Sequence, residues 1–228
     1  MWRLAWPTVL QNMIGGLQGI IDHVMVGHYV GFTGNAAIGV SWQIFLVVVV
    51  FVTSIYIGMG VLVARCAGAN DHDKVNRVVY QAFITSVVLA LGVLAPAGYF
   101  LSPCLLQIVN ATPEVAAEAL PYLRTMFVCS IGLLLYFLLA GALRAAGDAK
   151  TPLRLGLWIT GLNIILNVIF IRGLGPIPAF GVQGAAFGTV IASGLASAGG
   201  IWLMMTGRVV IHFPRSMSKQ PDWKIIRS

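Results

Sequence analysis

Charged side chains are scarce in this sequence. Only 9% of its 228 residues are Asp, Glu, Lys or Arg, whereas an ordinary soluble domain has roughly 25%. Hydrophobic residues make up 58% of the chain, more than the core of a soluble domain of this length could bury. The composition therefore excludes a soluble globular protein and indicates an integral membrane protein.

Signatures of catalysis and metal binding are missing as well. The sequence has no glycine-rich phosphate loop and no HExxH motif, and its four histidines are scattered. Its three cysteines, Cys66, Cys104 and Cys129, lie far apart without metal-ligand spacing, and their odd number favours no disulfide framework. We therefore expect neither an enzyme nor a metal site nor an organic cofactor.

Apolar residues are arranged in six long blocks. Each block has 19 to 29 residues, and about 20 residues suffice to cross a bilayer as a helix. The predicted spans are Leu4–Tyr29, Ala36–Ala64, Val78–Leu101, Tyr122–Leu143, Leu153–Ile171 and Val182–Met205. We therefore predict an all-α membrane protein with a six-helix lobe over residues 1–206, followed by a polar linker or tail over 207–228.

Basic residues gather on one side of the predicted spans. The net charge is +7, and twelve of the fourteen basic residues fall on the N-terminal side of the membrane. These are Arg3, Arg65, Lys74, Arg77, Arg144, Lys150, Arg154, Arg208, Arg215, Lys219, Lys224 and Arg227, against Arg124 and Arg172 on the other side. By the positive-inside rule both termini are cytoplasmic, in a multi-pass protein of the cell (inner or plasma) membrane. The membrane explains this charge better than a nucleic-acid partner does.

One acidic residue, Asp22, falls inside a predicted span, whereas the other six lie in loops or the tail. A carboxylate near the middle of a membrane helix costs at least about 2.5 kcal/mol, so its presence calls for a partner or a function. We place Asp22 in the outer half of the membrane and predict that it binds an ion. The alternative is an inert aspartate at the membrane interface.

Span five offers Asn163 and Asn167, which lie four residues apart and so on one helix face. If spans one and five are neighbours, the two carboxamides and Asp22 form a polar cluster that binds the ion. The alternative is that the asparagines only join helices by hydrogen bonds. Tyr136, Thr189 and Gln43 are further polar residues within spans. They are candidates for a substrate cavity, and the alternative is that they only pack helices together.

Small residues recur in two spans. Gly184, Gly188, Ala192, Ala196 and Gly200 lie four apart in span six, which predicts close packing against a neighbouring helix. Glycines 15, 16 and 19 in span one are expected either to pack in the same way or to let that helix bend.

Four motifs resemble those of multidrug and toxic compound extrusion (MATE) transporters. Pro7–Asn12 with Ile21–Gly27 is similar to the family's first helix, and Arg144–Pro152 to its R-G-x-G-D-T-x-T-P loop. Asn163–Asn167 is similar to its N-x-x-x-(N/D) segment in helix five, and Phe180–Ala186 to the entry into helix six. The motifs occur in the family's order over nearly the whole chain.

The resemblance implies one lobe of a twelve-helix transporter that exports drugs or other cationic or amphipathic organic compounds in exchange for H⁺ or Na⁺. Asp22, Asn163 and Asn167 would then bind the coupling ion. The partners implied are a small organic substrate, membrane lipids and a second six-helix lobe. Ala145 and Ala149 replace a glycine and a threonine of the loop motif, and Asn167 stands where some members have a second aspartate.

Two other functions stay open. A lipid-linked sugar flippase of the same superfamily would need basic residues that hold pyrophosphate, and no span has one in its middle. A membrane scaffold that transports nothing is the other alternative. The segment Trp223–Arg227 resembles the approach to a seventh helix, so we expect a fragment of a longer protein, or else a half-size protein that dimerises.

Overall fold

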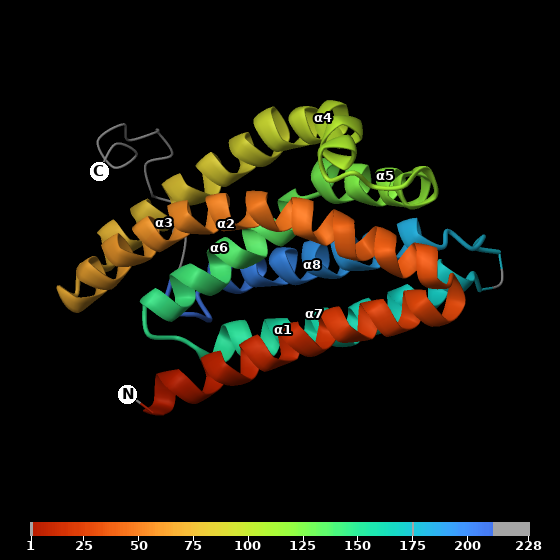
Figure 1. Cartoon of the computed structure of the whole chain (residues 1–228). Helices are drawn as coiled ribbons and strands as arrows, with labels where there is room; N and C mark the ends of the chain where they lie inside the picture. The colour runs from red at the N-terminus through yellow and green to blue at the C-terminus, as the bar shows by residue number, and fades with distance from the viewer. Residues whose placement is uncertain (1, 175, 212–228) are drawn as a thin grey trace.

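The computed structural model describes residues 2–174 and 176–211 (Figure 1). Over these residues the chain is a bundle of α-helices with one π-helical segment. The elements are α1 (Trp2–Tyr29), α2 (Phe32–Gly68), α3 (His72–Val88), η1 (Leu89–Leu94), α4 (Ala95–Ile108), α5 (Pro113–Val128), α6 (Ile131–Ala145), α7 (Lys150–Arg172) and α8 (Val182–Met205). The all-α fold predicted from composition is thus confirmed, whereas most of the predicted tail lies outside the described residues.

Within the described residues, four helical stretches are long and apolar enough to cross a membrane. They are α2, the continuous stretch His72–Ile108, α7 and α8, and the bent pair α5–α6 makes a fifth if it counts as one span. The helix α1 is 28 residues long but is not among them. That α1 is the sixth span stays a prediction.

The third predicted span is longer than expected and is not a regular α-helix. We predicted Val78–Leu101, but the helical stretch runs from His72 to Ile108 and passes through the π-helical segment η1. Pro96 lies just after η1, as the second residue of α4. A proline removes one helical hydrogen bond and its ring clashes with the preceding turn, so the wider π-helical turn gives the chain a way past it.

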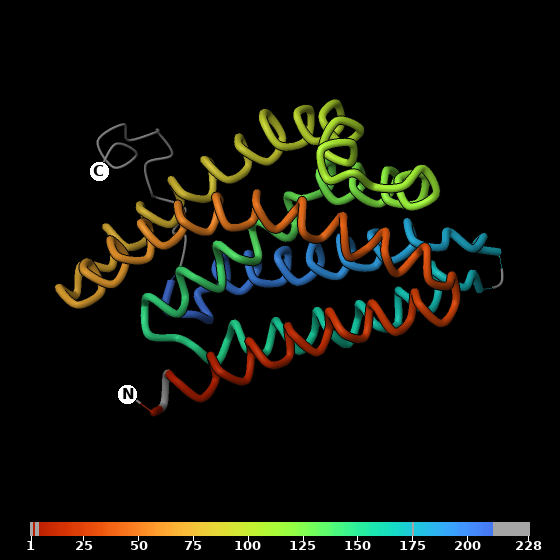
Figure 2. The backbone as a smooth tube through the Cα atoms, viewed as in Figure 1, coloured from red at the N-terminus to blue at the C-terminus, as the bar shows by residue number. Residues whose placement is uncertain are grey.

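The fourth predicted span is wrong as a single helix. Between Tyr122 and Leu143 the chain breaks at Cys129–Ser130, and α5 and α6 meet at an angle of 54°. Pro121 lies inside α5, and the hydroxyl of Thr125 donates to its carbonyl oxygen at 2.8 Å. A proline and a hydroxyl that bonds back to the preceding turn both bend helices. Figure 2 shows the sharp turn of the backbone here.

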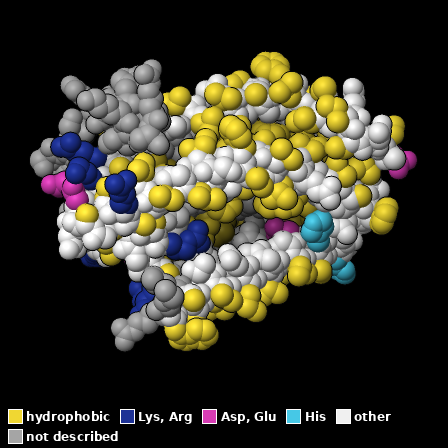
Figure 3. Space-filling view, turned by 60° about the vertical axis from the view of Figure 1, so that its left-hand side comes forward, with side chains coloured by type: hydrophobic (Ala, Val, Ile, Leu, Met, Phe, Trp, Pro, Cys, Tyr) yellow, Lys and Arg dark blue, Asp and Glu magenta, His cyan; other side chains and the backbone are white. Residues whose placement is uncertain are grey.

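The start of α1 and the end of α8 lie at the same end of the bundle, as do the α2–α3 and α6–α7 turns (Figure 1). On the face drawn in Figure 3, the Lys and Arg side chains gather at one end of the molecule. Arg124 in α5 and Arg172 at the end of α7 do not belong to the α2–α3 and α6–α7 turns. The basic loops of the sequence are therefore brought together in space. Which side of the membrane this end faces stays a prediction.

The turn between α2 and α3 is closed by Asp71. Its carboxylate accepts a hydrogen bond from the backbone N–H of Lys74 at 3.1 Å and pairs with the Lys74 ammonium at 2.8 Å. These contacts hold the pKa of Asp71 below its ordinary value. An ionised N-cap aspartate at this position satisfies one of the free N–H groups at the start of α3.

The small residues of α8 allow close packing, as the sequence predicts. A Cβ atom on Gly184 would lie 2.5 Å from the carbonyl oxygen of Phe170 in α7. In contrast, a Cβ on any of glycines 15, 16 and 19 would meet no atom within 4 Å, so these glycines of α1 do not pack closely against another element. The interpretation of α1 as a tightly packed small-residue helix is therefore wrong.

Candidate functional site

Two helices that are far apart in the sequence, α1 and α7, lie side by side along their length (Figure 1). The facing residues of α1 are Gln11, Gln18 and Asp22, spaced by seven and four residues. Those of α7 are Gly156, Thr160, Asn163 and Asn167, spaced by four, three and four. Both spacings keep the residues on one side of a helix. The interface between the two helices is therefore polar.

Asp22 is held by both predicted asparagines. The Nδ2 of Asn167 donates to its Oδ1 at 2.6 Å. The hydrogen bonds of Asn163 are best satisfied in one orientation of its amide. In it, Nδ2 donates to Asp22 at 2.9 Å, and Oδ1 accepts from the hydroxyl and the backbone N–H of Thr189 at 3.1 and 3.2 Å. Asn163 and Asn167 are fully buried, and Asp22 is partly buried. The carboxylate thus joins α1 to α7 directly and to α8 through Asn163.

The remaining oxygen of Asn167 is unusual. Its Oδ1 is buried and has no hydrogen-bond partner among the described residues. The amide lies against Gly188 of α8, where any side chain would collide with this oxygen. A buried amide oxygen without a hydrogen-bond donor destabilises the fold, so a proton donor or a cation that binds this oxygen would be favoured.

A second polar cluster lies further toward the start of α1. Gln11 donates from Nε2 to the hydroxyl of Tyr136 at 2.8 Å and accepts at Oε1 from the guanidinium of Arg144 at 3.1 Å. Gly156 makes room for it, because a Cβ there would lie 3.0 Å from the Tyr136 oxygen. This cluster joins α1 to α6.

The three candidate cavity residues are separated by the structure. Thr189 belongs to the Asp22 cluster and Tyr136 to the Gln11 cluster. Gln43 is exposed on α2 and belongs to neither cluster. Grouping Gln43 with the other two is therefore not supported by its position.

Several polar residues in and near these clusters were missed in the sequence. They are Gln11, Arg144, Gln18, which accepts a hydrogen bond from Thr160 at 3.1 Å, and Asn35, whose Oδ1 lies 2.5 Å from Nδ1 of His23. The spacing of Gln11, Gln18 and Asp22 was a signal that could have found the α1 residues. The contacts of Arg144 and Asn35 depend on how the helices pack, which the sequence does not show.

The surface of the molecule has a hollow beside these helices. Figure 3 shows it on the face drawn there, with apolar side chains in its depth, an acidic and a histidine side chain on its wall, and basic side chains toward the basic end. A hollow of mixed apolar and charged character suits an amphipathic ligand better than a purely polar one.

A carboxylate held by amides between helices of an apolar bundle, beside an open hollow, is typical of a membrane protein that binds or moves a solute. The family model described as MatE matches residues 7–169, and the chain belongs to this family. Its members are multi-pass membrane transporters and not enzymes.

Curated relatives agree with this assignment. The chain is 32% identical over 193 residues to a protein of Thermotoga maritima named "Probable multidrug resistance protein NorM", covering 83% of this chain and 40% of that protein. It is 28% identical over 220 residues to the "Probable multidrug resistance protein YpnP" of Bacillus subtilis, covering 96% of this chain and 48% of that protein. The chain therefore spans about half the length of these relatives.

Solved structures show the same half. A transporter of the MOP superfamily from Pyrococcus furiosus superposes with a TM-score of 0.87 at 25% identity, over 99% of this chain and 48% of the other. A structure described as the outward-facing conformation of a multidrug resistance MATE family transporter gives the same TM-score and identity, over 99% and 49%. The fold of the chain is thus that of one lobe of such transporters.

Proposed function

We propose that this chain is the N-terminal six-helix lobe of a secondary antiporter that exports cationic or amphipathic organic compounds in exchange for H⁺ or Na⁺. The observation that carries the proposal is the carboxylate of Asp22, held between α1 and α7 by two buried asparagines. The names of the relatives, which refer to multidrug resistance, support the substrate class. A second lobe completes the transporter.

The site offers different groups to the two ions. When Asp22 is ionised, both asparagine amides donate to it. When a proton binds, the carboxyl group becomes a donor, and the unpaired Oδ1 of Asn167 is an acceptor within the same cluster after the amide rotates. A Na⁺ ion, which takes oxygen ligands, would instead use the oxygens of Asp22, the two asparagines and Thr189.

Charge at Asp22 is coupled to the arrangement of the helices. The hydrogen bonds from Asn163 and Asn167 to Asp22 link α1 to α7, so an ion that replaces these donors changes the strength of the contact between the two helices. An ion that binds one arrangement of α1 better than the other shifts the population toward it. Ion entry can thereby drive the lobe toward the state that releases substrate.

Asp22→Asn in the full-length protein tests the proposal. The purified protein is reconstituted into lipid vesicles that are loaded with ethidium. Movement of the dye across the vesicle membrane is followed under an imposed H⁺ gradient and, separately, under an imposed Na⁺ gradient. We expect Asp22→Asn to lower gradient-driven efflux at least tenfold. The matched control is Glu118→Gln, which neutralises an exposed carboxylate on α5 and leaves efflux unchanged.

The results separate the alternatives. Full gradient-driven efflux by Asp22→Asn removes Asp22 from ion coupling. No dye movement by the unaltered protein under either gradient argues against the antiporter and leaves the flippase and the scaffold. The gradient that drives efflux names the ion.

A further inference from the structure

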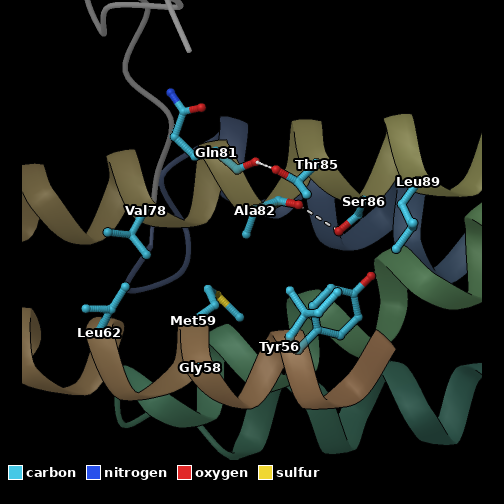
Figure 4. A pocket seen from close by; sticks show the side chains of 11 residues that line it. Tyr56, Gly58, Met59, Leu62, Val78, Gln81, Ala82, Thr85, Ser86 and Leu89 are labelled. Carbon is cyan, nitrogen blue, oxygen red and sulfur yellow. Dashed lines mark hydrogen bonds between the residues drawn. The ribbon is translucent and has the colours of Figure 1, made fainter. Parts of the chain in front are cut away.

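A cavity of about 200 Å³ lies between α2 and α3, and none of its lining residues belongs to α1 or α7. Side chains from both helices point into it (Figure 4). Its apolar walls include Met59 and Leu62 of α2 and Val78 of α3, and it ends at Leu89, the first residue of the π-helical segment η1. It is therefore a site separate from the Asp22 cluster.

Hydroxyl groups make one part of the wall polar. The Thr85 hydroxyl donates to the carbonyl oxygen of Gln81 at 2.9 Å, and the Ser86 hydroxyl donates to that of Ala82 at 2.6 Å (Figure 4). Each of these hydroxyls has used its single hydrogen but keeps lone pairs on its oxygen. They can accept hydrogen bonds from a ligand but cannot donate without giving up a backbone contact.

Tyr56 has the donor that these two lack. Its side chain is only 6% exposed, and its hydroxyl is buried without a hydrogen-bond partner among the described residues. The side chain of Ser86 is the one that interacts with this hydroxyl, and because its own hydrogen is directed at Ala82, only its oxygen can accept from Tyr56. The contact is not a well-formed hydrogen bond, so a ligand acceptor placed in this cavity with better geometry would replace Ser86 as the partner of Tyr56.

The surroundings of the cavity decide the kind of ligand. None of its lining residues is charged, which disfavours an ion. Ile55 at its edge is 44% exposed, and the neighbouring Ile57 and Val88 are 69% and 62% exposed. These residues lie on helices long and apolar enough to cross a membrane, so the cavity opens on an exposed apolar surface that suits contact with lipid chains. Its end at a π-helical segment adds to the argument, because such segments are frequent at functional sites.

We propose that the α2–α3 cavity binds the uncharged acyl-ester part of a molecule dissolved in the bilayer, which inserts an aliphatic chain between the two helices and accepts a hydrogen bond from Tyr56 at an ester or similar carbonyl oxygen. The acyl esters of phospholipids and neutral lipophilic solutes share this chemistry. The site is independent of the ion site at Asp22.

Photolabelling tests the proposal. The full-length protein is placed in phosphatidylcholine nanodiscs with either of two probes: a phosphatidylcholine with a diazirine on its acyl chain, or a diazirine-bearing fatty acid methyl ester. Labelled residues are mapped by mass spectrometry while unlabelled methyl ester is added as competitor. We expect saturable, competed labelling of Met59 and Leu89, whereas Phe100, which is 76% exposed on α4, is labelled in proportion to probe without saturation.

Two variants make the test specific. Gly58 lines the cavity and a Cβ there would meet no atom within 4 Å, so Gly58→Leu fills the space and removes saturable labelling. Gly141→Leu on α6, where a Cβ is equally free, leaves it unchanged. Tyr56→Phe keeps the shape but removes the donor, and weakens the apparent affinity by roughly two- to tenfold, the effect of one neutral hydrogen bond.

The outcomes divide clearly. Saturation by the phospholipid probe assigns the site to membrane lipid, and saturation by the methyl ester alone assigns it to a lipophilic solute. The proposal is overturned if labelling of Met59 and Leu89 follows that of Phe100 without saturation, or if neither Gly58→Leu nor Tyr56→Phe changes it. Unchanged labelling of Phe100 in both variants shows that they are still folded in the bilayer.

Discussion

The substitution Gly188→Ala is a sharp test of how the proposed ion site is built. Asn167 lies against Gly188, and a Cβ there would overlap its Oδ1 and lie 3.1 Å from its Cγ and 3.3 Å from its backbone nitrogen. If α7 and α8 moved apart to make room, they would also lose the close packing of Gly184 against the carbonyl of Phe170. The amide of Asn167 is therefore the group that has to give.

The size of the effect depends on how the added methyl group is accommodated. If the amide rotates, it gives up the 2.6 Å hydrogen bond to Asp22, and a hydrogen bond to a charged group contributes about 1.5–3 kcal/mol. If the backbone shifts instead, overpacking costs about 1–3 kcal/mol. Alanine is the better helix former by roughly 0.5–1 kcal/mol, which offsets part of either cost. We expect a net loss of about 1–2 kcal/mol in stability and a larger loss in ion coupling.

The assay compares Gly188→Ala with Gly199→Ala on the same helix, where a Cβ would meet no atom within 4 Å. Thermal unfolding of the full-length protein in detergent measures stability, and ethidium efflux from vesicles measures coupling. We expect Gly199→Ala to match or slightly exceed the unaltered protein, and Gly188→Ala to unfold at a lower temperature and to lose gradient-driven efflux. Equal behaviour of the two variants would refute the close contact between Asn167 and α8.

Two further predictions concern stability. Gly132→Ala would place a Cβ 2.7 Å from the Cα of Gly194; because the contact is with backbone, we expect a loss of about 1–3 kcal/mol in unfolding free energy, and none for Gly141→Ala, whose Cβ has free space. Asp71→Ala should lower the unfolding temperature more than Asp71→Asn, which keeps an acceptor for the Lys74 N–H. Since contact with Lys74 lowers the pKa of Asp71, the ionised cap stabilises above the ordinary aspartate range, and the difference between the unaltered protein and Asp71→Asn should disappear as pH falls through the lowered pKa in urea titrations.

The long helices could be predicted because hydropathy decides them. The span Val182–Met205 agrees with α8 residue for residue, and α2 and α7 extend the predicted spans by only a few residues at each end. The break between α5 and α6 could not be predicted in the same way, because the apolar run continues across it. Pro121 and Thr125 favour a bend in α5, but they do not show that the helix ends at Cys129–Ser130, close to where Gly132 approaches Gly194 of α8.

The candidate site was predicted only where a single helix contains the signal. Asp22 was found because a carboxylate is costly in a span, and Asn163 and Asn167 because they share one face of one helix. The Gln11–Tyr136–Arg144 cluster was not predicted, since its members come from α1 and α6 and nothing in either segment indicates the other. Ion binding by Asp22 and the two asparagines stays a prediction.

The helix α1 shows why a test of each helix by itself is limited. Among its side chains that the structure describes, Val26 is the one in the buried hydrophobic core, and much of the helix's inward face is polar. An unpaired polar group in lipid costs several kcal/mol, but Gln11, Gln18 and Asp22 are each bonded to a residue of α6 or α7. The polar groups of α1 are thus satisfied by the pair of helices and not by α1 alone, so its low hydropathy does not argue against its crossing the membrane beside α7. The same residues that make α1 a poor membrane helix by itself make its contact with α7 sensitive to the charge of Asp22.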